Sequence, residues 1–252
     1  MTLMTFLPES DVEQELLRQL EELGYQIESQ EYIGPDAPFA ERESYADVFS
    51  MRRLLEALER INPSVSIQTI EEAINQFTQN QLPNLTAENR RIHNLLIEGV
   101  DVQHESEDGS LITTKVYLID FNNPANNDWL ATNQYYVVGK QPRKPDVVVF
   151  INGIPIAVIE LKAPGSDSTI RDAFNQLQTY KSDIPGLFNT NGLLVISDGL
   201  TARIGSLTAD YERFMPWRTI DGEKVIEKGM PELTTLVAGV FEKHRLLKLI
   251  KD

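Results

Sequence analysis

Three charged residues stand inside an otherwise apolar stretch, PDVVVFINGIPIAVIELK, at residues 145–162. They are Asp146, Glu160 and Lys162. Charged side chains are rarely buried unless they are paired or bind something. Two carboxylates provide the hard oxygen ligands that suit Mg²⁺, and a neighbouring ammonium group could stabilise negative charge or orient a water molecule. These residue types together indicate metal-dependent hydrolysis of a phosphodiester bond.

The Asn-Gly pair at 152–153 predicts that this stretch forms a β-hairpin. Successive strand residues point to opposite faces, so Glu160 and Lys162 share one face. A plain two-residue turn would place Asp146 on the other face. A three-residue loop at 152–154 or a β-bulge would place Asp146 opposite Glu160. The proposed chemistry therefore requires an odd-numbered loop or a bulge.

Charges in a hairpin are more often solvated residues at the edge of a sheet than parts of a site. However, the runs DVVVFI and IPIAVIEL are apolar at almost every position, which is typical of central strands covered on both faces. We therefore expect the three charges to be buried. Two carboxylates that face each other repel, so the pKa of at least one should be raised.

Composition restricts the protein's class. The chain has 252 residues, of which 41% are hydrophobic. It contains no cysteine and only three histidines, which argues against disulfides and a zinc site.

Neither a signal peptide nor a membrane-spanning run is present, so we predict a cytoplasmic protein without membrane contact. The net charge of −15 argues against a nucleic-acid partner, but bases outnumber acids between residues 140 and 181, where the chain could face phosphates.

Periodicity and cap residues predict the surrounding elements. Helices are expected at residues 10–24, 44–63, 66–81, 86–99, 168–184 and 230–252. Strands are expected at residues 25–33, 111–121, 132–140, 192–199 and 201–207, in addition to the hairpin. This order predicts an α/β fold in which helices flank a central mixed β-sheet.

The hairpin and its surroundings resemble a known family. PD followed by ELK resembles the PD-(D/E)xK nuclease motif and its restriction-endonuclease-like core. The segments NNPANNDWLATNQYYVVG, RKPDVVVFINGIPIAVIELKAPG and AFNQLQTYKSDIPGLF resemble the N-terminal endonuclease domain of the R (restriction) subunit of type I restriction–modification enzymes. The resemblance is close over residues 90–200 and looser at the first helix.

The resemblance implies roles for individual residues. Asp146 and Glu160 would bind the metal, with the carbonyl of Leu161 as a candidate third ligand. Lys162 would be the catalytic lysine, which orients the attacking water or stabilises the charge of the transition state.

Three further residues match the family's pattern and also have a simpler interpretation. Gln176 and Tyr180 fit its Q-x-x-x-Y motif and share one helix face, although such a pair can also be the polar rim of an amphipathic helix. Glu13 resembles a first-helix glutamate of such nucleases. Alternatively, Ser10 and Glu13 form a capping box at the N-terminus of the helix. The sequence leaves both interpretations open.

The resemblance also implies cofactors, partners and domain limits. It implies Mg²⁺, for which Mn²⁺ could substitute, double-stranded DNA, and separate methyltransferase and specificity subunits. ATP would belong to a helicase motor, because no G-x-x-x-x-G-K-[ST] loop occurs here. We expect a nuclease domain at residues 1–230 and a C-terminal helix at 231–252 that leads toward this motor.

Rival functions are a free-standing repair or anti-phage nuclease and a catalytically inactive docking or DNA-binding module. A glycosidase with paired carboxylates is disfavoured, because a buried lysine beside the acid has no role in that mechanism.

Overall fold

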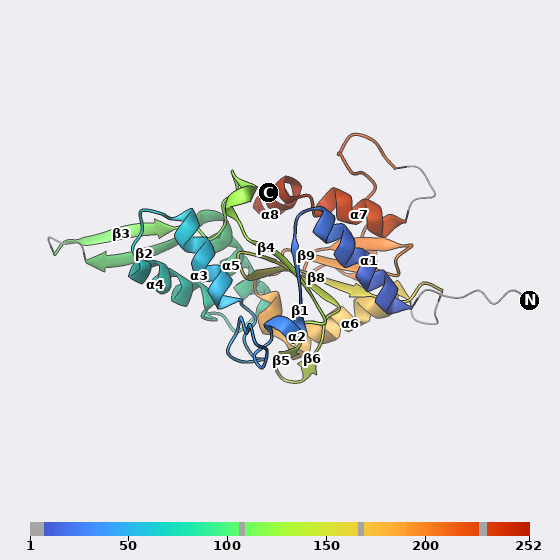
Figure 1. The fold of residues 1–252 in the computed structure, drawn as a ribbon, viewed down its shortest axis with the longest axis horizontal. Coiled ribbons are helices and arrows are strands. Elements are labelled where there is room, and N and C mark those ends of the chain that lie inside the picture. The colour runs from blue at the N-terminus through green and yellow to red at the C-terminus, as the bar shows by residue number, and fades with distance from the viewer. Residues whose placement is uncertain (1–7, 106–108, 166–168, 227–230) are drawn as a thin grey trace, which may run out of the picture.

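A mixed six-stranded β-sheet forms the centre of the protein (Figure 1). The computed structural model describes residues 8–105, 109–165, 169–226 and 231–252. In spatial order the strands are β1 (Gln26–Ser29), β4 (Trp129–Asn133), β7 (Val147–Ile151), β8 (Ile154–Leu161), β9 (Leu193–Ser197) and β10 (Ala202–Gly205). β1 pairs with β4 and β8 with β9 in parallel, whereas the other pairs are antiparallel. The predicted mixed α/β fold is therefore confirmed.

Helices cover both faces of this sheet. They are α1 (Glu9–Glu22), α2 (Gln30–Ile33), α3 (Met51–Ile61), α4 (Ile67–Thr78), α5 (Leu85–Glu98), α6 (Ile170–Asp183), α7 (Glu232–Val240) and α8 (Lys243–Lys251). One core cluster joins α1, α7 and α8 to the face of β7 that carries Val147 and Val149. A second cluster joins Leu177 and Tyr180 of α6 to the opposite face, which carries Val148. The two hairpin strands are central and buried along their whole length, as predicted.

A separate two-stranded ribbon projects from the body (Figure 1). It consists of β2 (Val100–Glu105) and β3 (Leu111–Val116), which pair antiparallel and pack against α4. Smaller elements complete the described fold: β5 (Val137–Val138), β6 (Pro142–Arg143) and 3-10 helices at Pro124–Asn126, Pro185–Phe188 and Tyr211–Arg213. β2 was not predicted from the sequence, although the alternation of Val100 and Val102 with polar residues is a strand signal.

The central hairpin combines a two-residue turn with a bulge. Ile151 pairs directly with Ile154, and the turn residues Asn152 and Gly153 have φ angles of 54° and 73°, so the suggested three-residue loop is wrong. Between the Phe150–Pro155 and Val149–Ala157 pairs the register shifts by one residue. The extra residue is Ile156. This bulge is the alternative that the sequence analysis left open, and it restores the register that brings Asp146 to the face of Glu160.

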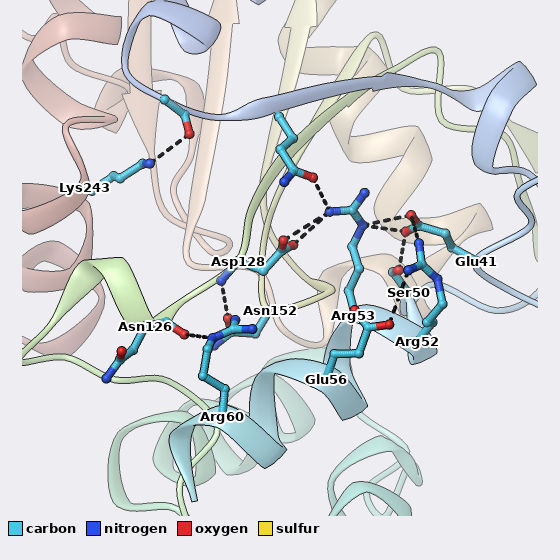
Figure 2. Close-up of polar contacts among 12 residues, drawn as sticks. Glu41, Ser50, Arg52, Arg53, Glu56, Arg60, Asn126, Asp128, Asn152 and Lys243 are labelled. Atoms are coloured by element: carbon cyan, nitrogen blue, oxygen red, sulfur yellow. Dashed lines mark hydrogen bonds and ion pairs between the residues drawn. The ribbon is translucent and has the colours of Figure 1, made fainter. Parts of the chain in front are cut away.

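A buried network of charged and polar groups holds the hairpin turn in place. Figure 2 shows Arg53 of α3 between Glu41 and Asp128. Its Nε lies 2.7 Å from Glu41 Oε2, and its Nη1 lies 3.1 Å from Asp128 Oδ2. The backbone NH of Asp128 donates to the side-chain oxygen of Asn152 at 2.7 Å. The turn is thereby linked to α3 and to the start of β4, so the far end of the hairpin is fixed by contacts remote from the charged end.

Several predicted elements have different limits in the structure. The helix expected at 44–63 begins only at Met51, and the strand expected at 25–33 is β1 followed by α2. The C-terminal segment is two helices rather than one, because Glu242 accepts hydrogen bonds from the backbone of residues 244 and 245 and so begins α8. The expected helix starts at 168 and 230 and the first seven residues lie outside the described residues.

Candidate active site

The three charged residues of the hairpin meet at its open end. Asp146 precedes β7, Glu160 lies near the end of β8, and Lys162 follows β8 directly. All three are buried, with exposed fractions of 6%, 0% and 8%. The Lys162 Nζ donates to Glu160 Oε1 at 3.1 Å and to the Leu161 carbonyl at 2.6 Å. The Leu161 NH donates to Asp146 Oδ2 at 2.8 Å, so four predicted site residues form one connected group.

Both carboxylates have pKa values well above the ordinary range. Burial raises the pKa of Asp146 to about 6, against the opposing effects of the Leu161 NH and Lys162. Burial, and then the charge of Asp146, raise the pKa of Glu160 to about 8. The predicted direction is correct, but desolvation is the largest cause for both groups, and the charge of the other carboxylate contributes only to the pKa of Glu160. Strongly perturbed acids in a group of this kind are typical of functional sites.

The group fits a hard divalent cation. Glu160 Oε2 is buried and has no hydrogen-bond partner among the described residues, so it has an unused lone pair in the interior. The Lys162 ammonium already lies among the oxygens of Glu160 and Leu161, which shows that these atoms can surround a positive charge. In the described parts of the chain, no group of three or more acidic, histidine or cysteine side chains is spaced to hold a metal. The ligand set would therefore be two carboxylates and a carbonyl, completed by water.

Glu13 faces this group instead of capping its helix. α1 begins at Glu9 and follows Pro8, so Ser10 is inside the helix and the capping-box interpretation is wrong. The Glu13 carboxylate is 8% exposed and accepts hydrogen bonds from the side-chain amides of Asn133, at 2.8 Å, and Gln134. Its side chain is thus held against the end of β4 and the residue that follows it, and does not cap α1.

Gln134 connects Glu13 to Asp146 and was not singled out in the sequence. Its side-chain amide donates to Asp146 Oδ1 at 3.3 Å as well as to Glu13, and its backbone NH donates to the Asp146 carbonyl at 2.7 Å. Its φ of 52° is unusual for a residue other than glycine. Glu9 was also missed; its carboxylate lies 3.9 Å from the Lys162 Nζ. No local signal identifies either residue, because both contacts join distant segments.

Gln176 and Tyr180 lie on the face of α6 that borders the site. The Gln176 amide donates to the Tyr180 hydroxyl at 2.6 Å. Tyr180 is 3% exposed, and its pKa is raised by burial and by the negative charges of Glu160 and Asp146. The tyrosine hydroxyl is therefore close enough to the carboxylates to be influenced by them. The polar-rim interpretation fails for Tyr180, which belongs to the core cluster on this side of the sheet.

The described residues include no helix long and apolar enough to cross a membrane. A mixed sheet flanked by helices, with a charged hairpin end between α1 and α6, has the form of a restriction-endonuclease-like core. Residues 6–213 match the family described as type I restriction enzyme R protein N terminus, and the chain belongs to this family.

Relatives carry corresponding names. The type I restriction enzyme HindI endonuclease subunit of Haemophilus influenzae is 34% identical over 97% of this chain and 24% of its own length. A Methanocaldococcus jannaschii protein with the provisional name of type I restriction enzyme MjaIXP endonuclease subunit is 34% identical over 96% of this chain and 25% of its own length. The type I restriction enzyme EcoprrI endonuclease subunit of Escherichia coli is 26% identical over 98% of this chain and 74% of its own length. The chain spans about a quarter of the length of the first two relatives.

Proposed function

We propose that this chain is the nuclease domain of a type I restriction R subunit and hydrolyses phosphodiester bonds in unmodified DNA. The observation that carries the proposal is the convergence of Asp146, Glu160 and Lys162 at the end of a buried hairpin. Membership of the family and the names of the relatives support the same activity. A docking module would have no need of three buried charges whose desolvation opposes folding.

Asp146, Glu160 and the Leu161 carbonyl would hold Mg²⁺, and Mn²⁺ could substitute because it takes the same hard oxygen ligands. A bound divalent ion would polarise the phosphoryl group and favour formation of a nucleophile from water at neutral pH. The Lys162 ammonium, which now donates to Glu160, would turn toward the substrate and stabilise the charge that develops on the phosphate. Glu13, held by two side-chain amides, keeps a third acidic group beside the site.

The partners follow from the same proposal. The substrate is double-stranded DNA, and the complete protein would assemble with methyltransferase and specificity subunits in the cytoplasm. ATP would act only through a helicase motor encoded outside these residues, because the sequence has no phosphate-binding loop.

DNA cleavage with and without divalent metal tests the proposal. In the complete protein, Mg²⁺ or Mn²⁺ should support cleavage and a chelator should abolish it. Glu160→Gln and Asp146→Asn should each lower the cleavage rate by roughly 10² or more, as expected when a metal ligand is lost. Asp101→Asn, an exposed acid paired with Lys115 on the ribbon, is the matched control and should cleave normally. Undiminished cleavage by Glu160→Gln, or cleavage in chelator, would contradict the proposal.

A further inference from the structure

A groove opens beside the candidate active site, between β6 and α6. Its volume is about 610 Å³. Arg143 and Lys144 form one wall and Asn175, Gln176, Thr179 and Tyr180 form the other. Tyr180 also packs in one core cluster with Val158, on the face of β8 that carries Glu160, so this wall of the groove adjoins the site.

The groove is basic in an acidic protein. The chain has a net charge of −15, yet none of the described residues that line the groove is acidic. Arg143 is held by Asp183 at the end of α6, with Nε 2.7 Å from Oδ2, so this ion pair fastens β6 to the helix. Lys144 is exposed and has no ion-pair partner among the described residues, and its charge is therefore available to a ligand.

The position of Lys144 fits a strand of DNA whose scissile phosphate lies at the carboxylates. Lys144 precedes Asp146 by two residues, so their Cα atoms are at most about 7 Å apart. Its ammonium group can therefore reach a neighbouring phosphate while the site holds the reacting one. On the opposite wall, Asn175 and Thr179 are exposed polar residues four apart on one helix face. The Thr179 hydroxyl donates to the Asn175 carbonyl at 3.2 Å, so the Asn175 side-chain amide is the group that can donate to the same backbone.

We propose that this groove binds the DNA strand next to the scissile phosphate, with Lys144 as its phosphate contact. The inference rests on the proposed nuclease function and adds the surface along which DNA reaches the site. A rival surface exists on α8, whose exposed Lys248 belongs to a basic segment, KHRLLKLIK. The groove is preferred because it adjoins the site, and the test separates the two surfaces.

Binding of a short DNA duplex at several salt concentrations tests the groove. We expect Lys144→Ala to weaken binding several-fold and to reduce the salt slope by about 0.9, which corresponds to one lost phosphate contact. Lys144→Glu should weaken binding by roughly tenfold or more, because it adds repulsion. Lys248→Ala is the matched control, since it also removes one exposed lysine, and its binding should equal that of the wild type. Unchanged binding by both Lys144 variants would overturn the proposal, and weakening by Lys248→Ala in that case would place the DNA on α8.

A second measurement locates the DNA without removing a charge. The chain has no cysteine, so Thr179→Cys introduces a single thiol on the groove wall and Asn75→Cys introduces one at an exposed position of α4. DNA should slow maleimide labelling of the first thiol at least several-fold and leave the second unchanged. Equal labelling of the Thr179→Cys protein with and without DNA would overturn the proposal that DNA lies in the groove. If wild-type protein still cleaves with Mg²⁺ in that case, the nuclease function stands and only the DNA path is wrong.

Discussion

The Lys162 ammonium contacts both a carboxylate and a carbonyl that we assign to the metal. We infer two roles for the lysine from this arrangement. Without metal its ammonium donates to Glu160, and with metal and substrate it would be free to interact with the phosphate. A single side chain would thus link the stability of the site to its chemistry.

Replacement of Lys162 should separate cleavage from binding. In Lys162→Ala the carboxylates remain, so metal and DNA binding should largely persist, while cleavage should fall by about 10² or more through loss of a charge stabiliser. The measurement is single-turnover cleavage at saturating Mg²⁺, with DNA binding measured in parallel. Lys140→Ala, which removes an exposed lysine, is the control and should cleave normally. Wild-type cleavage rates in Lys162→Ala would refute the role of this residue.

Gln134 should act by positioning the acids. Gln134→Met keeps the length of the side chain but removes the amide that bridges Glu13 and Asp146. With both carboxylates less constrained, we expect the Mg²⁺ concentration for half-maximal cleavage to rise several-fold, with a smaller change in the rate at saturation. Gln103→Met, at an exposed position of β2, is the matched control. A lower saturating rate with an unchanged Mg²⁺ requirement would instead assign Gln134 a direct role in the chemistry.

At the scale of elements, the turn at one end of the hairpin helps to position the charged residues at the other end. Gly153 has a φ of +73°, and a Cβ at this residue would lie 2.3 Å from the Ser50 carbonyl oxygen. The turn therefore needs glycine both for its conformation and for its close approach to the residue before α3. The bulge then converts this turn into the register that joins Asp146 to Glu160.

A substitution in the turn should destabilise the whole sheet. Gly153→Ala adds a backbone clash to the strain of a left-handed conformation, and we expect a loss of about 2 kcal/mol or more in the free energy of unfolding. Gly222→Ala is a matched control, because Gly222 has a φ of +85° but no atom within 4 Å of the added Cβ. Chemical denaturation of both variants gives the difference due to the clash. Equal losses of unfolding free energy in the two variants would show that the close approach to Ser50 does not contribute to the destabilisation.

The elements also show what the sequence could predict. The central hairpin was predictable because an Asn-Gly turn joins two apolar runs, and the fold class followed from the order of helices and strands. The bulge at Ile156 has no local signature, so its position could not be predicted. The contacts of Glu13 with Asn133 and Gln134 span 120 and 121 residues, a separation at which helix spacing and cap patterns carry no information. The capping-box prediction failed because α1 begins at Glu9, so Ser10 lies inside the helix and cannot be its N-cap residue.

At the scale of the whole molecule, the site makes folding depend on pH. In the unfolded chain Asp146 and Glu160 have ordinary pKa values of 3.8 and 4.5, whereas in the folded protein they are about 6 and about 8. Between pH 4 and pH 8 the folded state therefore binds more protons than the unfolded state. Under this condition the free energy of unfolding decreases as pH rises. The destabilisation is absent below the unfolded pKa values and complete above about pH 8.

The metal-free protein should consequently be more stable near pH 5 than near pH 8, and Mg²⁺ should reverse part of this loss. Ionised carboxylates bind the cation, so millimolar Mg²⁺ should raise the Tm more at pH 8 than at pH 5. Thermal unfolding at both pH values, with and without Mg²⁺, measures both effects. The double variant Asp146→Asn, Glu160→Gln keeps every other titrating group, including most of the net charge of −15. Subtracting the pH dependence of the double variant from that of the wild type isolates the contribution of the two carboxylates to the free energy of unfolding. Each unit by which folding raises the pKa of a carboxyl group corresponds to roughly 1.4 kcal/mol. If wild type and double variant show the same pH slope and the same indifference to Mg²⁺, the two carboxylates do not form a metal site.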